Sequence, residues 1–244
     1  MSNQTDYQAK IIEIEALPDE QTKSPNMPVD VFLQEAENLS VWCQQDKDLL
    51  IKAGLNWSLV DDLSVRAGVL REAESFWFNA RFAREKSRKE WKEKSPLAFD
   101  LRNRLLHDFG FAFRNDEALA VKVSAIAKGS RNADMIQDLN DLAVFGKANP
   151  GPLSKTGFEF HLLDEAAAKA DEMADLLSRA ASEREKTVRK KIIRNKAYTL
   201  LKNNVDEIRA CGQYVFWRNE ERIRGYISHY HKKRRTKNDE APRI

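Results

Sequence analysis

The sequence predicts an all-α protein, an antiparallel multi-helix bundle built from two tandem related halves. Three observations predict this class. The 244 residues include only 9 Gly and 7 Pro, so few residues that break helices interrupt the chain. Long segments are rich in Ala, Leu, Glu, Lys and Arg, which favour helices. Two stretches about 103 residues apart resemble each other, and repeated sets of antiparallel helices predict a bundle whose halves are related by a pseudo-twofold axis.

The internal similarity is clearest between residues 32–63 and 135–166. It includes a glycine that lies between two helical segments, which raises it above the chance resemblance of two amphipathic helices. Near the ends of the halves, residues 113–116 resemble residues 217–220 at an offset of 104. Pairs at the constant offset of 103 residues are Gln34 and Gln137, Leu39 and Leu142, Val41 and Val144, Trp42 and Phe145, Gly54 and Gly157, Leu59 and Leu162, and Asp61 and Asp164.

These halves give the expected organisation of the chain. We expect a polar N-terminal arm, a first helical repeat, a connector helix with a turn, a second helical repeat and a basic C-terminal tail. Their respective ranges are 1–27, 28–116, 117–132, 133–230 and 231–244.

The first repeat is expected to contain three helices. Pro28 precedes the first helix, which extends to about Ala53. The second begins near Leu59 and has apolar residues in steps of three or four, as one buried helix face requires. Ser95 and Pro96 should end it, because proline suits the first turn of a new helix. That third helix reaches about residue 112.

The second repeat is expected to follow a connector helix at about 117–128, which ends at Gly129. Its first helix covers about 133–148 and stops at the Asn-Pro-Gly-Pro sequence of residues 149–152. A further helix begins near Leu162, and the last helical segment extends to about Tyr230. The boundary between these two helices is left open, because nothing like Ser95-Pro96 separates them.

The joint between the first two helices of each repeat is the best-defined local feature. Gly54 and Gly157 follow apolar helical runs, where a helix commonly ends on a residue with positive φ. Ser58, with Asp61 three residues later, predicts an N-cap and a capping box for the next helix. Asp164 corresponds to Asp61 in the second half.

Other features of the sequence predict a cytoplasmic protein. No apolar run approaches the roughly 20 residues that span a bilayer, and the first residues lack the pattern of a secretory signal. Cys43 and Cys211 are the only cysteines. We expect them to be free thiols, as in a reducing cytosol.

The charge is unevenly distributed, although the net charge is only +3. The tail at 231–244 has six basic and two acidic residues, so the rest of the chain is close to neutral. A basic tail adds salt-sensitive affinity for nucleic acid. The candidate nucleic-acid contacts are Lys232, Lys233, Arg234 and Arg235.

The sequence predicts no catalytic, cofactor-binding or metal-binding residue. It lacks the Glu-x-x-His pairs of di-metal bundles and the Gly-x-Ser-x-Gly sequence of serine hydrolases. Residues 149–156 resemble a phosphate-binding loop only superficially, because Ser154 stands where the motif requires glycine before the lysine. We therefore expect no cofactor and no metal.

The aromatic residues suggest a partner. Phe76, Trp77 and Phe78 are consecutive, so one helix face cannot bury all three, and a second helix or a partner must cover the rest. The preferred hypothesis is a non-enzymatic helical protein-interaction or scaffold module. A nucleic-acid-associated protein and an enzyme whose site no motif reveals are the alternatives.

Overall fold

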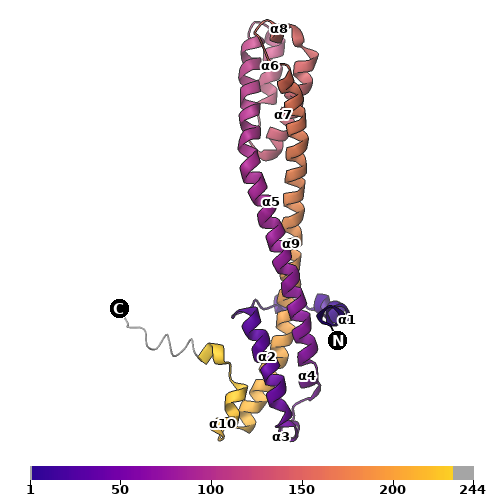
Figure 1. The fold of residues 1–244 in the computed structure, drawn as a ribbon, viewed down its shortest axis with the longest axis vertical. Coiled ribbons are helices and arrows are strands. Elements are labelled where there is room, and N and C mark those ends of the chain that lie inside the picture. The colour runs from indigo at the N-terminus through magenta and orange to yellow at the C-terminus, as the bar shows by residue number, and fades with distance from the viewer. Residues whose placement is uncertain (1, 233–244) are drawn as a thin grey trace, which may run out of the picture. The chain divides into compact units, whose positions relative to one another are not determined.

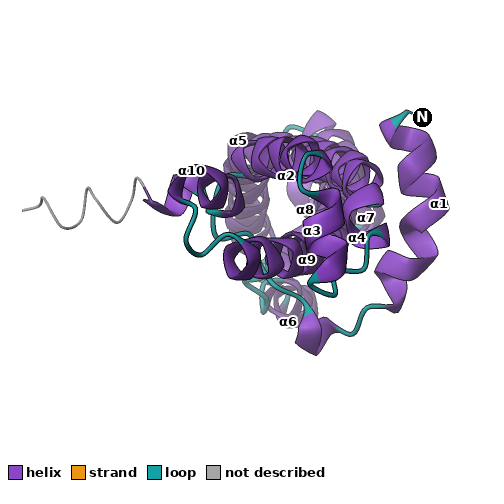
Figure 2. Cartoon of the chain, turned by 90° about the horizontal axis from the view of Figure 1, so that it is seen from below, coloured by secondary structure: helices purple, strands orange, loops and turns teal. Residues whose placement is uncertain are grey.

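The computed structural model describes residues 2–232, and the regular secondary structure in that range is helical throughout (Figures 1 and 2). The predicted all-α class is confirmed. Within the same range, no helix combines the length and the apolar character needed to cross a membrane.

The chain forms two compact units, which we call unit 1 and unit 2. Unit 1 comprises residues 1–80 and 187–244, and unit 2 comprises residues 81–186. The two longest helices, α5 (Leu63–Ala112) and α9 (His161–Val215), each contribute residues to both units (Figure 1). Each unit therefore contains segments from both of the predicted repeats.

Unit 1 surrounds a core formed by the first part of α5, the last part of α9 and several shorter helices. Phe32, Leu39, Leu70, Tyr198 and Tyr226 are each at most 2% exposed in this core. The shorter elements of unit 1 are α1 (Asn3–Ala16), η1 (Asp19–Gln21), α2 (Val29–Gln44), α3 (Lys47–Lys52), α4 (Ser58–Asp61), α10 (Glu220–Ile223) and η2 (Arg224–Tyr226).

Unit 2 has its own core between the remaining parts of α5 and α9. Phe109 and Phe113 are fully buried there and meet edge to face, with ring centroids 5.4 Å apart. Both rings also contact Phe145. The shorter helices of unit 2 are α6 (Glu117–Ile126), α7 (Asn132–Ala148) and α8 (Pro150–Ser154). A helix is present where the connector was predicted, and α7 ends before residue 149 as expected, but residues 150–152 belong to α8 and do not form a turn.

The predicted helix end at Ser95-Pro96 is wrong, because α5 continues through Pro96. An interior proline removes the hydrogen bond to the carbonyl four residues earlier. Here that carbonyl belongs to Lys92, and both Lys92 and Pro96 are exposed. Water is therefore available to the carbonyl that has lost its donor.

The predicted first helix, residues 28–53, is instead two helices, α2 and α3, which meet at Asp46. The side chain of Asp46 is buried and accepts hydrogen bonds from the Tyr226 hydroxyl (2.6 Å) and from Arg222. These partners lie 180 and 176 residues away in sequence. A tertiary network therefore determines where α2 ends.

The two ends of the chain also differ from expectation. The N-terminal arm contains helix α1, capped by Ser2, and its Ile14 is buried. The last predicted helix ends at Val215 and not near Tyr230, because α10 begins afresh with Asn219 as its N-cap.

Candidate functional site

Each glycine joint ends a helix in the same way. Gly54 has φ +97° and Gly157 has φ +73°, which confirms the predicted positive φ at both positions. The residue after each glycine donates its N–H to the carbonyl of a buried leucine five residues earlier, as in a Schellman motif. These bonds are Leu55 to Leu50 at 3.0 Å and Phe158 to Leu153 at 3.3 Å.

The capping box predicted at Ser58 and Asp61 is wrong. Ser58 is the first residue of α4, and its N–H and its hydroxyl both donate to Oδ1 of Asn56, at 3.1 and 2.8 Å. Asn56 forms this local turn because its side chain reaches the backbone two residues later. Asp61 is exposed at the other end of the short α4, whereas Asp164 in the first turn of α9 pairs with Lys147 at 2.6 Å.

Of the candidate nucleic-acid contacts, only Lys232 belongs to the described residues. Its backbone N–H donates to the Ser228 carbonyl (3.1 Å) in a final helical turn. Lys233, Arg234 and Arg235 lie outside the described residues.

Both cysteines are free. Burial raises the pKa of Cys43 to about 12, and burial also raises the pKa of Cys211. Both thiols therefore stay protonated near neutral pH, where a nucleophilic cysteine would need to be a thiolate.

The consecutive aromatic residues of α5 divide between burial and exposure. Phe76 and Trp77 are half-buried beneath cations from α9, with Lys190 5.0 Å from the Phe76 centroid and Arg194 4.3 Å from that of Trp77. Phe78 is 54% exposed. The helices of unit 1 thus cover two of the three rings.

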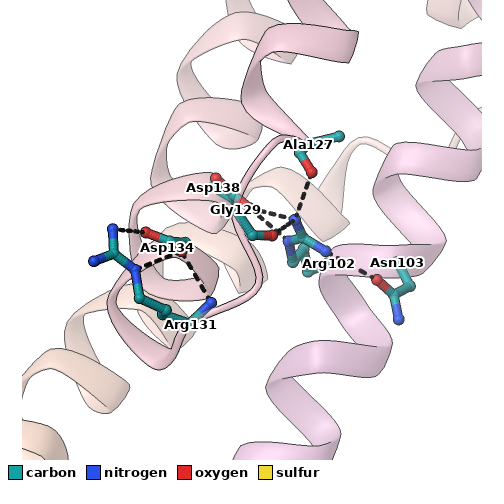
Figure 3. Close-up of polar contacts among 7 residues, drawn as sticks. All are labelled: Arg102, Asn103, Ala127, Gly129, Arg131, Asp134 and Asp138. Atoms are coloured by element: carbon teal, nitrogen blue, oxygen red, sulfur yellow. Dashed lines mark hydrogen bonds and ion pairs between the residues drawn. The ribbon is translucent and has the colours of Figure 1, made fainter.

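A buried ion pair in unit 2 anchors the turn after α6. Nε of Arg102 donates to Asp138 at 2.6 Å, and its Nη2 donates to the carbonyls of Ala127 (3.3 Å) and Gly129 (3.0 Å). Figure 3 shows the guanidinium of Arg102, on α5, between Asp138 of α7 and this turn. Burial raises the pKa of Asp138, and the hydrogen bond from Arg102 opposes that effect.

A partly buried ion pair in unit 1 anchors the segment after η2. Glu35 of α2 pairs with Arg209 of α9 at 2.8 Å and accepts hydrogen bonds from the Tyr230 N–H (2.9 Å) and the Ser228 hydroxyl (3.2 Å). Burial alone would raise the pKa of Glu35, but these donors outweigh burial and lower it. The carboxylate is therefore ionised and fully engaged at neutral pH.

Sequence reasoning missed both carboxylates. Glu35 and Asp138 lie 103 residues apart, inside the stretch that showed the internal similarity. An acid at the same place in two matched helices was the available signal. Their arginine partners gave none, because Arg102 and Arg209 are not at matched positions.

A groove of unit 1 lies beside the Glu35 pair and has a volume of about 500 Å³. One wall is the face of α2 that carries Asn38, Val41, Trp42 and Gln45, and the opposite wall comes from residues 224–229. Val41 is 71% exposed. The indole N–H of Trp42 donates to the Arg222 carbonyl (3.2 Å). Because this N–H already has a partner within the chain, the indole contributes apolar surface to the groove.

Gly225 allows residues 224–229 to approach α2 closely. A Cβ added at this position would lie 2.1 Å from Nε1 of Trp42, which is far inside van der Waals contact. The corresponding segment of unit 2 is the regular helix α6, whose Leu119, Val123 and Ile126 pack on the unit 2 core. The irregular wall of the unit 1 groove thus depends on glycine.

A smaller groove in unit 2, of about 240 Å³, is more polar. Arg104, His107, Asp108 and Glu159 contribute to its lining, together with the exposed Phe111. Arg104 pairs with Glu159 at 2.8 Å, and Arg114 stacks on Phe111 at 3.9 Å. Arg104 and Glu159 are therefore engaged with each other, and Arg114 covers one face of the Phe111 ring.

Comparisons with protein-family models, with curated proteins and with solved structures find no match. Among residues 2–232, no cluster of three or more His, Cys, Asp or Glu side chains is arranged to hold a metal ion. The groove of unit 1 is accordingly the feature on which a functional proposal is best built.

Proposed function

We propose that this chain is a non-enzymatic, cytoplasmic protein-interaction module, and that a partner protein docks in the groove of unit 1. The observation that carries the proposal is Val41, 71% exposed, beside the half-buried Trp42 and Ile227 in a groove of about 500 Å³. The proposal of a non-enzymatic role is supported by Cys43 and Cys211, which are at least partly buried and whose raised pKa values keep both thiols protonated. Free thiols also support a cytoplasmic location.

The position of Val41 distinguishes it from an ordinary exposed apolar residue. Single apolar side chains on a protein surface are common and need no explanation. Val41 instead borders a concave surface with further apolar walls, and helix faces beside such grooves commonly accept an apolar segment of another protein. Val144 provides a matched comparison, because it is 61% exposed at the corresponding place on α7.

Site-specific photo-crosslinking tests this function. A photo-reactive phenylalanine analogue is placed at position 41 or at position 144 of the full chain, and the chain is irradiated in its native cells. We expect a protein adduct at position 41 and none at position 144, and the partner it identifies should bind the purified chain. Identical adducts at both positions, or adducts with nucleic acid alone, would overturn the proposal.

We also infer that the chain arose by tandem duplication, with an offset of 103 residues. Three matched features support this inference: the two glycine joints with positive φ, the ion-paired acids Glu35 and Asp138, and the N-caps Asp116 and Asn219 of α6 and α10. The two N-caps are 103 residues apart, whereas residues 113–116 resemble residues 217–220 at an offset of 104. The N-caps therefore match without an inserted residue. The pseudo-twofold axis stays a prediction.

A further inference from the structure

The charges of the unit 1 groove restrict the chemistry of its partner. Its lining includes one carboxylate, Glu35, and two guanidinium groups, Arg209 and Arg224. Glu35 is saturated by Arg209, the Tyr230 N–H and the Ser228 hydroxyl. It therefore has little capacity left to attract a cation, and the groove retains an excess of positive charge.

Of the two arginines, Arg224 has donors that a partner can reach. Nε of Arg209 has no hydrogen-bond partner among the described residues, but it is buried, and Nη2 of Arg209 is paired with Glu35. Arg224 is exposed, and its guanidinium makes neither a hydrogen bond nor an ion pair within residues 2–232. Guanidinium groups bind carboxylates through paired, charge-assisted hydrogen bonds, so a carboxylate is the ligand that would satisfy this end of the groove.

The wall of the groove that α2 forms determines the shape of the partner. Asn38, Val41 and Trp42 of α2, with Gln45 at its C-cap, follow the spacing i, i+3, i+4 and i+7, which is the stripe that one helix presents to another. Val41 and Trp42 provide apolar surface at the middle of this stripe. A partner helix would place aliphatic side chains there and acidic side chains toward residues 224–229.

We propose that the unit 1 groove binds an amphipathic helix with an aliphatic stripe flanked by acidic residues, whose carboxylates pair with the exposed Arg224. This inference rests on the proposed function, because it names the class of partner for the same groove. Affinity comes from burial of the aliphatic stripe, and Arg224 selects acidic partners over basic ones.

Two synthetic peptides of about 18 residues, long enough to form a helix on binding, test this inference. They share one Leu and Ala stripe, and the flanking positions are Glu in one peptide and Lys in the other. Binding of each fluorescent peptide to the full chain is measured by anisotropy. We expect the Glu peptide to bind at least about tenfold more tightly than the Lys peptide, which corresponds to about 1.4 kcal/mol.

Three variants locate the interaction. Val41→Asp should weaken binding of the Glu peptide at least about tenfold, while Val144→Asp, its counterpart on α7, should leave binding unchanged. Arg224→Glu should reduce or reverse the preference for the Glu peptide. Circular dichroism of each variant confirms that the helices are intact before binding is compared.

The outcomes separate this inference from the proposed function. Equal binding of both peptides, still lost in Val41→Asp, would overturn the acidic specificity and leave the docking groove in place. Failure of both peptides to bind, or binding that ignores Val41→Asp, would overturn both. A wild-type dimer in sedimentation that Val41→Asp dissociates would make a second copy the occupant and overturn the acidic partner.

Discussion

Gly54 and Gly157 have positive φ in surroundings that leave room for a side chain. A Cβ built at either position meets no atom within 4 Å. The cost of replacing these glycines is therefore confined to the backbone, since residues other than glycine are strained at positive φ. Asparagine tolerates this region better than β-branched residues do.

We accordingly expect Gly54→Asn to destabilise the protein clearly less than Gly54→Val, which should cost about 1–2 kcal/mol or more. Gly157→Asn and Gly157→Val should follow the same order, because that glycine ends its helix with the same hydrogen bonds. Urea unfolding of the four variants measures the losses. Equal losses for Asn and Val at both positions would show that backbone conformation is not what these glycines provide.

Glu35 makes a pH-dependent contribution to stability. Its pKa is lowered in the folded protein, so its contribution is complete above the unfolded pKa of about 4.3 and is lost as the pH falls through the folded value. The free-energy difference between wild type and Glu35→Gln should therefore be large at pH 7 and should shrink below about pH 4. A difference that grows on acidification would contradict the pairing of Glu35 with its three donors.

The same measurement on Glu20→Gln controls for the removal of a surface charge. Glu20 lies in the exposed turn η1. Exposed charges typically contribute at most about 1 kcal/mol. At pH 7 we therefore expect Glu35→Gln to cost clearly more than Glu20→Gln.

At the scale of elements, the sequence predicted the helices whose ends are set locally and missed those set by distant contacts. The glycine joints, the connector helix α6 and the start of α7 all follow from nearby residues. The end of α2 depends on Asp46, Arg222 and Tyr226, which are far apart in sequence. The groove was equally beyond prediction, because it forms only when residues 224–229 fold back onto α2.

Pro96 tests the continuity of α5. An interior proline costs a helix about 3 kcal/mol relative to alanine, so Pro96→Ala should stabilise the protein by about 1–3 kcal/mol. Ser95→Ala, at the neighbouring position, should change the stability by no more than about 0.5 kcal/mol. A loss of stability in Pro96→Ala would indicate instead that proline begins a new helix at this point, as the sequence alone predicted.

At the scale of the whole molecule, neither unit is made from one continuous half of the chain. Unit 1 requires residues 1–80 and 187–244, whereas residues 81–186 form unit 2. Any cut between residues 81 and 186 leaves the two parts of unit 1 on different fragments. The long helices α5 and α9 thus tie the folding of each unit to both predicted repeats.

A protease site inserted after the exposed Ser130 tests this organisation. After cleavage, we expect the two fragments to elute together from a size-exclusion column, because the unit 1 core joins α2 and α5 to the last part of α9. A site inserted after Lys232 is the control, since cleavage there leaves all of residues 2–232 on one fragment. Separation of the Ser130 fragments without denaturant would contradict the two-segment composition of unit 1.

Methyl NMR shows directly whether a partner binds in the groove beside Val41. The full chain is labelled at valine methyl groups and titrated with the Glu peptide, and Val41→Ala and Val144→Ala assign the two signals. We expect the Val41 signals to shift with saturation while the Val144 signals stay in place. Shifts at Val144 with none at Val41, or no shift at either valine, would contradict this expectation.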